Sequence, residues 1–123
     1  MSSYNDLDIY KLAYKQAIEV HDMSLTLPKY ELFEQSSQVR RSTKTIKDTI
    51  AEGYGRRRYK ADFIKFLVYA QSSCDEILSQ LNMISDIHFK ENPLVNLINR
   101  YDILGKKINK FIEYVEKNWN NNQ

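Results

Sequence analysis

The sequence predicts an all-α protein, folded as an antiparallel up-down-up-down four-helix bundle. The 123 residues include only 3 Gly and 2 Pro, too few for the many turns of a β-sandwich. Apolar residues recur at three- and four-residue spacing along four long segments, which is typical of amphipathic helices. Short connections between these segments favour antiparallel packing of neighbours. We therefore expect a single domain, residues 1–123, with helices over about 6–26, 33–54, 60–89 and 93–119.

The first predicted helix, over 6–26, has one face that we expect to lie against the core. Its members are Leu7, Tyr10, Tyr14, Ala17, Ile18, His21 and Leu25, spaced for one side of a helix. Asn5 or Asp6 is the expected N-cap, because a short polar side chain accepts hydrogen bonds from the first free N–H groups. Pro28 is expected to keep the helix from continuing.

The second and third predicted helices have clearer core faces. Over 33–54 the expected core residues are Val39, Thr43, Ile46, Ile50 and Tyr54. Gly53 and Gly55 are expected to end this helix, since glycine readily adopts the left-handed conformation common at helix C-termini. Over 60–89 the period holds for six turns, at Phe63, Phe66, Leu67, Ala70, Cys74, Ile77, Leu81 and Ile84.

The fourth predicted helix, over 93–119, has a start pattern at Asn92-Pro93. Asn caps free N–H groups, and Pro is tolerated in the first turn because its missing donor is not needed there. The expected core residues are Leu94, Leu97, Tyr101, Leu104, Ile108, Phe111, Val115 and Trp119.

The third predicted helix is apolar over more of its circumference than a lone bundle requires. Ile64 and Val68 lie roughly 100° and 140° from Phe63 around the helix axis, which widens the apolar arc to about 200°. Tyr69 adds an amphipathic ring of the kind enriched at subunit contacts. We expect Ile64, Val68 and Tyr69 to form a homo-oligomer interface. The alternative is that loops of the same monomer cover them.

The composition is that of a globular protein of the cytoplasm. It is 42% hydrophobic and 28% charged, and no apolar run approaches the roughly 20 residues of a membrane span. The opening residues show no signal-peptide pattern. Cys74 has no second cysteine to pair with, which suits a reducing compartment. We therefore expect a cytoplasmic location and no membrane partner.

The formal net charge of +2 conceals a strongly basic segment, residues 39–60. Eight of its residues are basic and two, Asp48 and Glu52, are acidic, a local charge of +6 against −4 for the rest of the chain. Such a concentration of positive charge attracts polyanions. Arginine also binds phosphate in a bidentate manner, and a tyrosine ring can stack on a base or on a guanidinium. The expected nucleic-acid-binding residues are Arg40, Arg41, Lys44, Lys47, Tyr54, Arg56, Arg57, Arg58 and Lys60.

The basic segment could also serve two purposes that need no nucleic acid. Cations near a helix C-terminus offset the helix dipole and stay solvated. They can also pair with carboxylates of a neighbouring subunit or of a protein partner, which would make the chain an interaction scaffold without RNA binding of its own. The sequence leaves both alternatives open.

Catalytic chemistry is not expected. His21 and His88 fall near the same end of the bundle, but the chain lacks the Glu-x-x-His pairs of metal-binding bundles, so capping or partial burial is expected for both. Cys74 lies on a core face, where a thiol behaves as a small hydrophobe. Glu52 and Glu76 are more simply read as capping or interhelical hydrogen-bonding groups. We therefore expect no catalytic residues, no metal and no other cofactor.

Two stretches resemble a known family. The first runs from Ser37-Gln38-Val39-Arg40-Arg41 through Ile46 to Ile50-Ala51-Glu52-Gly53-Tyr54-Gly55-Arg56, and the second comprises Phe63-Ile64-Lys65-Phe66-Leu67, Ala70, Ser73, Glu76 and Gln80-Leu81. They resemble the four-helix-bundle proteins encoded in intervening sequences of bacterial large-subunit (23S) ribosomal RNA genes. Lys47 and Thr49 depart from the family, where Pro and Asn are common.

The resemblance implies a homopentameric bundle with a role in binding RNA or another nucleic acid. It carries over to Arg40, Arg41, Glu52, Gly53, Gly55 and Arg56. Similar bundles also serve as accessory subunits of retroelement reverse transcriptases.

Overall fold

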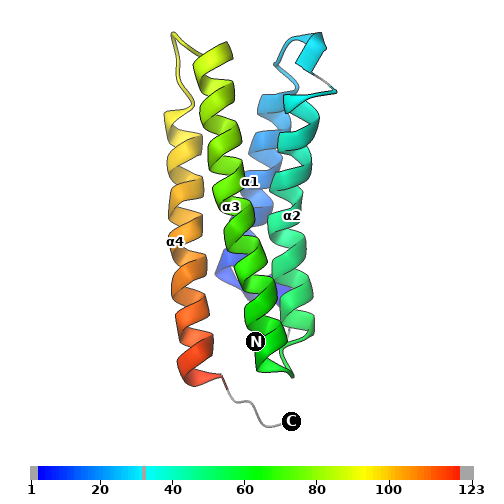
Figure 1. The fold of residues 1–123 in the computed structure, drawn as a ribbon, viewed down its shortest axis with the longest axis vertical. Helices are drawn as coiled ribbons and strands as arrows, with labels where there is room; N and C mark the ends of the chain where they lie inside the picture. Colours follow the sequence, from blue (N-terminus) through cyan, green and yellow to red (C-terminus); the bar gives the residue numbers. More distant parts are fainter. Residues whose placement is uncertain (1–2, 32, 120–123) are drawn as a thin grey trace.

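Four long helices lie side by side in an elongated bundle (Figure 1). The computed structural model describes residues 3–31 and 33–119. Two short 3₁₀ helices, η1 (Tyr4–Asp6) and η2 (Lys29–Glu31), accompany α1 (Asp8–Ser24), α2 (Gln35–Gly55), α3 (Lys60–His88) and α4 (Val95–Asn118). The described residues contain no strand. The predicted all-α fold with four helices is confirmed, and each helix begins and ends within two residues of its predicted bounds.

Helices that follow one another in the sequence run in opposite directions. Ser36, near the start of α2, donates a hydrogen bond of 3.0 Å to the carbonyl of Ser24 at the end of α1. Lys60, at the start of α3, donates to the carbonyl of Glu116 near the end of α4. In Figure 1 the α1–α2 and α3–α4 connections lie at one end of the bundle and the α2–α3 connection lies at the other.

The core faces of α2, α3 and α4 are close to those predicted. All five predicted residues of α2 are buried, and so are all those of α3 except Phe66, which is half-buried. On α4 the buried residues run from Leu97 to Val115, with Ile112 buried in place of Phe111. Tyr101 and Phe63 are the largest fully buried side chains.

The predicted core face of α1 is only partly right: Leu7 and Ala17 are buried and Tyr10 and His21 are half-buried, but the other three predicted residues are exposed. The buried residues of α1 are Ile9, Ala13, Gln16, Ala17, Val20 and Ser24. Tyr14, Ile18 and Leu25 are instead 50%, 52% and 59% exposed. The small side chains of Ala13 and Ala17 let α1 pack closely against its neighbours, whereas amphipathic tyrosine rings are stable at the edge of a helix contact. An aromatic and aliphatic surface therefore faces outward from α1.

Two predicted helix starts are also corrected. Asn5 and Asp6 belong to η1, and α1 begins after Leu7, which provides no capping side chain. At the start of α4, the cap position is Leu94 rather than Asn92. Its N–H donates a 3.0 Å hydrogen bond to the hydroxyl of Ser85 on α3, so a side chain from another helix satisfies the donor.

The glycines of α2 have a different role from the one predicted. Every described glycine has a negative φ, and α2 continues in right-handed geometry through Gly55. A Cβ placed on Gly53 would lie 2.9 Å from the Cβ of Phe66 on α3. Gly53 therefore permits close approach of α2 and α3.

One polar pair is buried inside the bundle, and a second, partly buried pair lies at its end. The hydroxyls of Thr43 on α2 and Tyr101 on α4 hydrogen-bond to each other, and burial raises the pKa of Tyr101. At the end shared by the α1–α2 connection and the C-terminus of α3, His88 Nε2 lies 2.6 Å from Glu31 Oε2. The partial burial predicted for His88 is confirmed, and Glu31 is a partner that the sequence did not indicate.

Candidate nucleic-acid interface

The structure divides the predicted basic surface into two groups. The α2 cations are Arg40, Arg41, Lys44 and Lys47, which lie between the first turns and the middle of α2. The loop cations are Arg56, Arg57, Arg58 and Lys60, which lie at the α2–α3 connection. Two turns of helix separate the groups, so the basic segment forms no single continuous surface.

Three of the loop cations are engaged by other groups of the same chain. Arg56 forms ion pairs of 3.2 Å with Glu52 and 3.6 Å with Asp62. Lys60 donates a 2.6 Å hydrogen bond to the carbonyl of Glu116. Arg57 donates to the carbonyl of Tyr54 at 2.9 Å. Of these contacts, the Lys60 bond ties the α2–α3 connection to the end of α4, the Arg57 bond lies at the end of α2, and the exposed Arg56 pairs link α2 to α3. Exposed ion pairs contribute only about 0–1 kcal/mol each, so Arg56 is occupied but not locked in place.

Tyr54 is not available for base stacking. Its side chain is 4% exposed, and the Arg57 guanidinium lies 4.0 Å from the centre of its ring. Of the two predicted partners for the Tyr54 ring, the structure therefore has the guanidinium, and the expected contact of Tyr54 with a base is wrong. Arg58 lies 5.8 Å from the ring of Tyr59 and, within the described part of the chain, forms no ion pair. Arg58 is the loop cation best placed to meet an external anion.

The α2 cations also differ in whether they contact other parts of the chain. Arg40 points toward the end of α1, where it donates to the hydroxyls of Ser24 and Ser36. Its guanidinium therefore joins α1 to α2, and it is removed from the predicted phosphate surface. Arg41 and Lys44 are exposed and form no ion pair with any residue that the structure describes.

Lys47 of α2 pairs with the carboxylate of the next residue. It lies 2.7 Å from Asp48, and this hydrogen bond raises the pKa of the Lys47 ammonium. Lys47 therefore stays protonated at neutral pH. An exposed pair of this kind contributes only about 0–1 kcal/mol, so a phosphate can compete with Asp48 for the ammonium.

A groove between α1 and α2 brings two of these cations beside the exposed surface of α1. The groove has a volume of about 370 Å³ and is lined by Tyr14, Ala17, Ile18, His21, Lys44 and Lys47. The Lys47 ammonium lies 5.9 Å from the centre of the Tyr14 ring. Sequence reasoning missed this site because it assigned Tyr14 and Ile18 to the core. The tyrosines at successive turns were the available signal, but the same pattern also fits a core face.

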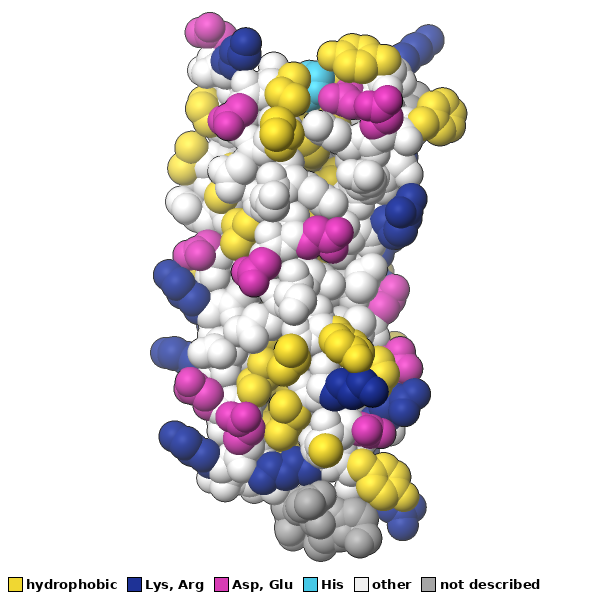
Figure 2. All heavy atoms as spheres, in the orientation of Figure 1, with side chains coloured by type: hydrophobic (Ala, Val, Ile, Leu, Met, Phe, Trp, Pro, Cys, Tyr) yellow, Lys and Arg dark blue, Asp and Glu magenta, His cyan; other side chains and the backbone are white. Residues whose placement is uncertain are grey.

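The predicted oligomer interface lies on the outer side of α3. Val68 and Tyr69 are 42% and 45% exposed, and Ile64 is half-buried. The Tyr69 ring contacts Phe66 edge-on at 5.5 Å. Figure 2 shows hydrophobic side chains gathered over the lower part of α3. The described loops leave Val68 and Tyr69 open, which argues against covering by the same monomer.

A family model decides the relationship of the chain to known proteins. The model of the 23S rRNA-intervening sequence protein matches residues 5–110. The chain belongs to this family. The resemblance noted in the sequence is thereby confirmed. The matched range contains α1, α2 and α3 entirely, and with them the groove. No curated protein matches the chain.

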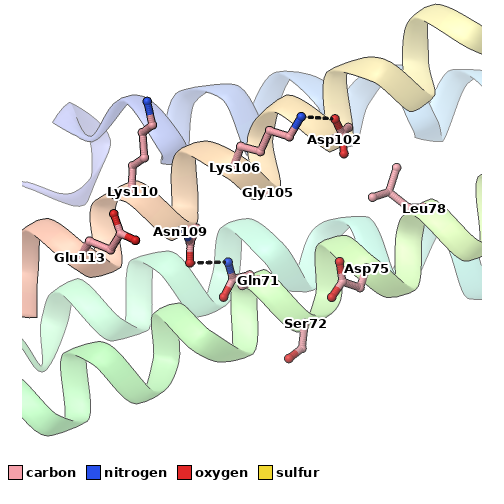
Figure 3. A pocket seen from close by; sticks show the side chains of 10 residues that line it. All are labelled: Gln71, Ser72, Asp75, Leu78, Asp102, Gly105, Lys106, Asn109, Lys110 and Glu113. Atoms are coloured by element: carbon pink, nitrogen blue, oxygen red, sulfur yellow. Dashed lines mark hydrogen bonds and ion pairs between the residues drawn. The ribbon is translucent and has the colours of Figure 1, made fainter.

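This member of the 23S rRNA-intervening sequence protein family also has a polar groove between α3 and α4 (Figure 3). Gln71 and Asn109 hydrogen-bond across it at 3.1 Å. Lys106 and Asp102 form a 3.0 Å ion pair along α4. Because charges of both signs line it, this groove has no preference for a polyanion.

The free cysteine of the chain, Cys74, is buried in the core. Burial raises the pKa of Cys74 to about 12, so the thiol is neutral at physiological pH and is a poor nucleophile. Across residues 3–31 and 33–119, no group of three or more His, Cys, Asp or Glu is placed to hold a metal ion. No described helix has both the length and the apolar character needed to cross a membrane.

Proposed function

We propose that this 23S rRNA-intervening sequence protein is a non-enzymatic, cytoplasmic RNA-binding protein. It contacts the phosphate backbone through Arg41, Lys44 and Lys47 on α2, with Arg58 as a separate contact. The main support is that Arg41 and Lys44 are exposed and form no ion pair among the described residues, and that Lys47 lies one turn further along α2. Contacts to phosphate supply affinity without reading sequence.

The salt dependence of binding tests this proposal. Fluorescence anisotropy measures the affinity for a labelled single-stranded RNA of about 16 nucleotides between about 50 and 200 mM salt. In the double variant Lys44→Gln/Lys47→Gln, the slope of log affinity against log salt is expected to fall by about 1.4, since each phosphate contact on a single strand contributes about 0.7.

The matched control is Lys106→Gln/Lys110→Gln, which removes the same charge from α4. Equal losses in the two double variants would mean that only net charge matters and would refute the α2 site. Absence of RNA binding by the unmodified protein would refute the function itself.

We also propose that copies of this chain associate through the outer side of α3. The support is the exposed apolar pair Val68 and Tyr69, beside which the charge of Arg56 is offset by Glu52 and Asp62. The number five comes from the family resemblance alone. A scaffold or accessory-subunit function needs this assembly but no RNA.

Light scattering after size-exclusion chromatography tests the association. Val68→Asp is expected to shift the protein toward the 14.6 kDa monomer, because a carboxylate would be buried at the contact. Val95→Asp is the control, since Val95 is 54% exposed on α4. A wild-type protein that is monomeric at all concentrations would contradict association, and equal effects of the two variants would place the contact elsewhere.

A further inference from the structure

We infer that the α1–α2 groove binds unpaired bases, so that single-stranded RNA rather than duplex is the ligand. This inference rests on the proposed function and adds a stacking residue, Tyr14, to it. The groove combines an exposed aromatic ring, an aliphatic wall and two cations. Basic grooves with aromatic platforms are the usual means of binding single strands without sequence preference.

The tyrosines of α1 and η1 form a row beside the groove. The Tyr10 and Tyr14 ring centres are 6.1 Å apart and the rings are tilted by 40°. Tyr4 contacts Tyr10 edge-on at 4.8 Å. Tyr14 is half exposed and is the member of this row that lines the groove, so part of its ring can be reached by a planar ligand.

The charges of the groove select the ligand. None of the described residues that line it is acidic, whereas Lys44 and Lys47 lie at its rim. The Lys47 ammonium near the Tyr14 ring can contact the phosphate of a nucleotide whose base covers that ring. Ala17 and Ile18 give the groove an aliphatic part, which suits the hydrophobic face of a base more than a hydrated ion.

A single strand fits this arrangement better than a duplex. In a duplex each base is stacked between its neighbours, so its flat faces cannot reach a protein ring. Bases of single strands and loops can be splayed out and stacked on aromatic side chains. A ligand that uses both Tyr14 and the lysines must therefore offer unpaired bases next to its phosphates.

The experiment compares a labelled single-stranded RNA with a blunt duplex of the same sequence, using the full chain and anisotropy. Tyr14→Leu keeps the apolar bulk but removes the aromatic face, and Tyr14→Phe keeps the face. We expect Tyr14→Leu to weaken single-strand binding about 5- to 150-fold and Tyr14→Phe to bind nearly as the wild type does. Tyr114→Leu is the matched control, since Tyr114 is 51% exposed on α4, and its affinity should not change.

The remaining outcomes overturn the inference in distinguishable ways. If Lys44→Gln/Lys47→Gln weakens binding while Tyr14→Leu does not, phosphate binding stands and base stacking is refuted. Equal affinity for the duplex also refutes stacking. If Tyr14→Leu changes the molar mass in light scattering, the groove is occupied by a second copy of this chain. If the wild type binds neither RNA, the proposed function fails together with the inference.

Discussion

Replacing Gly53 by alanine tests why α2 and α3 approach so closely near the α2–α3 connection. The added Cβ would lie 2.9 Å from Phe66 Cβ and 3.5 Å from the carbonyl oxygen of Phe63. Both atoms are tied directly to the α3 backbone, so rotamer changes cannot relieve the clash and the two helices must separate. Overpacking of this kind costs about 1–3 kcal/mol, while alanine gains about 0.8–1.0 kcal/mol of helix propensity over glycine. We expect a net loss of up to about 2 kcal/mol in the free energy of unfolding.

Gly55→Ala is an internal control two residues away in the same helix. No heavy atom lies within 4 Å of a Cβ placed there, so this variant keeps the propensity gain of up to about 1 kcal/mol. Because both variants have the same propensity gain, they should differ by the overpacking cost of about 1–3 kcal/mol, or about 4–12 °C in Tm for a chain of this length. Circular dichroism during heating and in urea, at one protein concentration, measures both quantities. If Gly53→Ala melts at or above Gly55→Ala, close packing is not the reason for Gly53.

Two further predictions concern buried polar and nucleophilic groups. Glu31→Ala should lower the free energy of unfolding by about 1–3 kcal/mol, because it leaves the partly buried imidazole of His88 without its partner. Urea unfolding of Glu31→Ala, His88→Ala and the double variant completes a double-mutant cycle. Additive effects of the two substitutions would contradict a direct interaction. Because burial raises the pKa of Cys74 to about 12, its thiol should react with Ellman's reagent at pH 8 only after guanidinium unfolding, and rapid reaction of the folded protein would contradict the burial.

Periodicity predicted the core best where large aliphatic side chains define it. On α3, seven of the eight predicted core residues are buried, because Leu and Ile have no polar group that could favour the surface. The prediction failed in part on α1, where the buried face contains Ala13, Gln16 and Ser24. These residues are small or polar, so a hydrophobicity pattern gives them little weight, and the neighbouring tyrosines satisfy the same spacing.

Helix ends and cation partners were beyond sequence reasoning for a related reason. The partner of the Leu94 N–H is Ser85 on another helix, and Lys60 bonds to the carbonyl of Glu116, 56 positions away. A helical wheel gives the direction of a side chain around its own axis. It does not show which distant group lies at the end of that direction.

Whether a basic side chain already contacts another part of the chain determines whether it is available to bind a ligand. Arg40 and Lys60 join the ends of helices, and Arg56 links the end of α2 to Asp62 on α3 through an exposed ion pair, so an RNA that recruited them would have to displace contacts of the chain. The Arg57 side chain bonds to the carbonyl of Tyr54 at the end of α2 itself. Arg41 and Lys44 carry no such cost. The Tyr14 ring is exposed and contributes little to the core. A polar residue at this position would avoid exposing apolar area, so folding alone does not call for a tyrosine there. A groove that combines cations and an aromatic ring, none of them required by the core, is therefore better explained by a ligand than by folding.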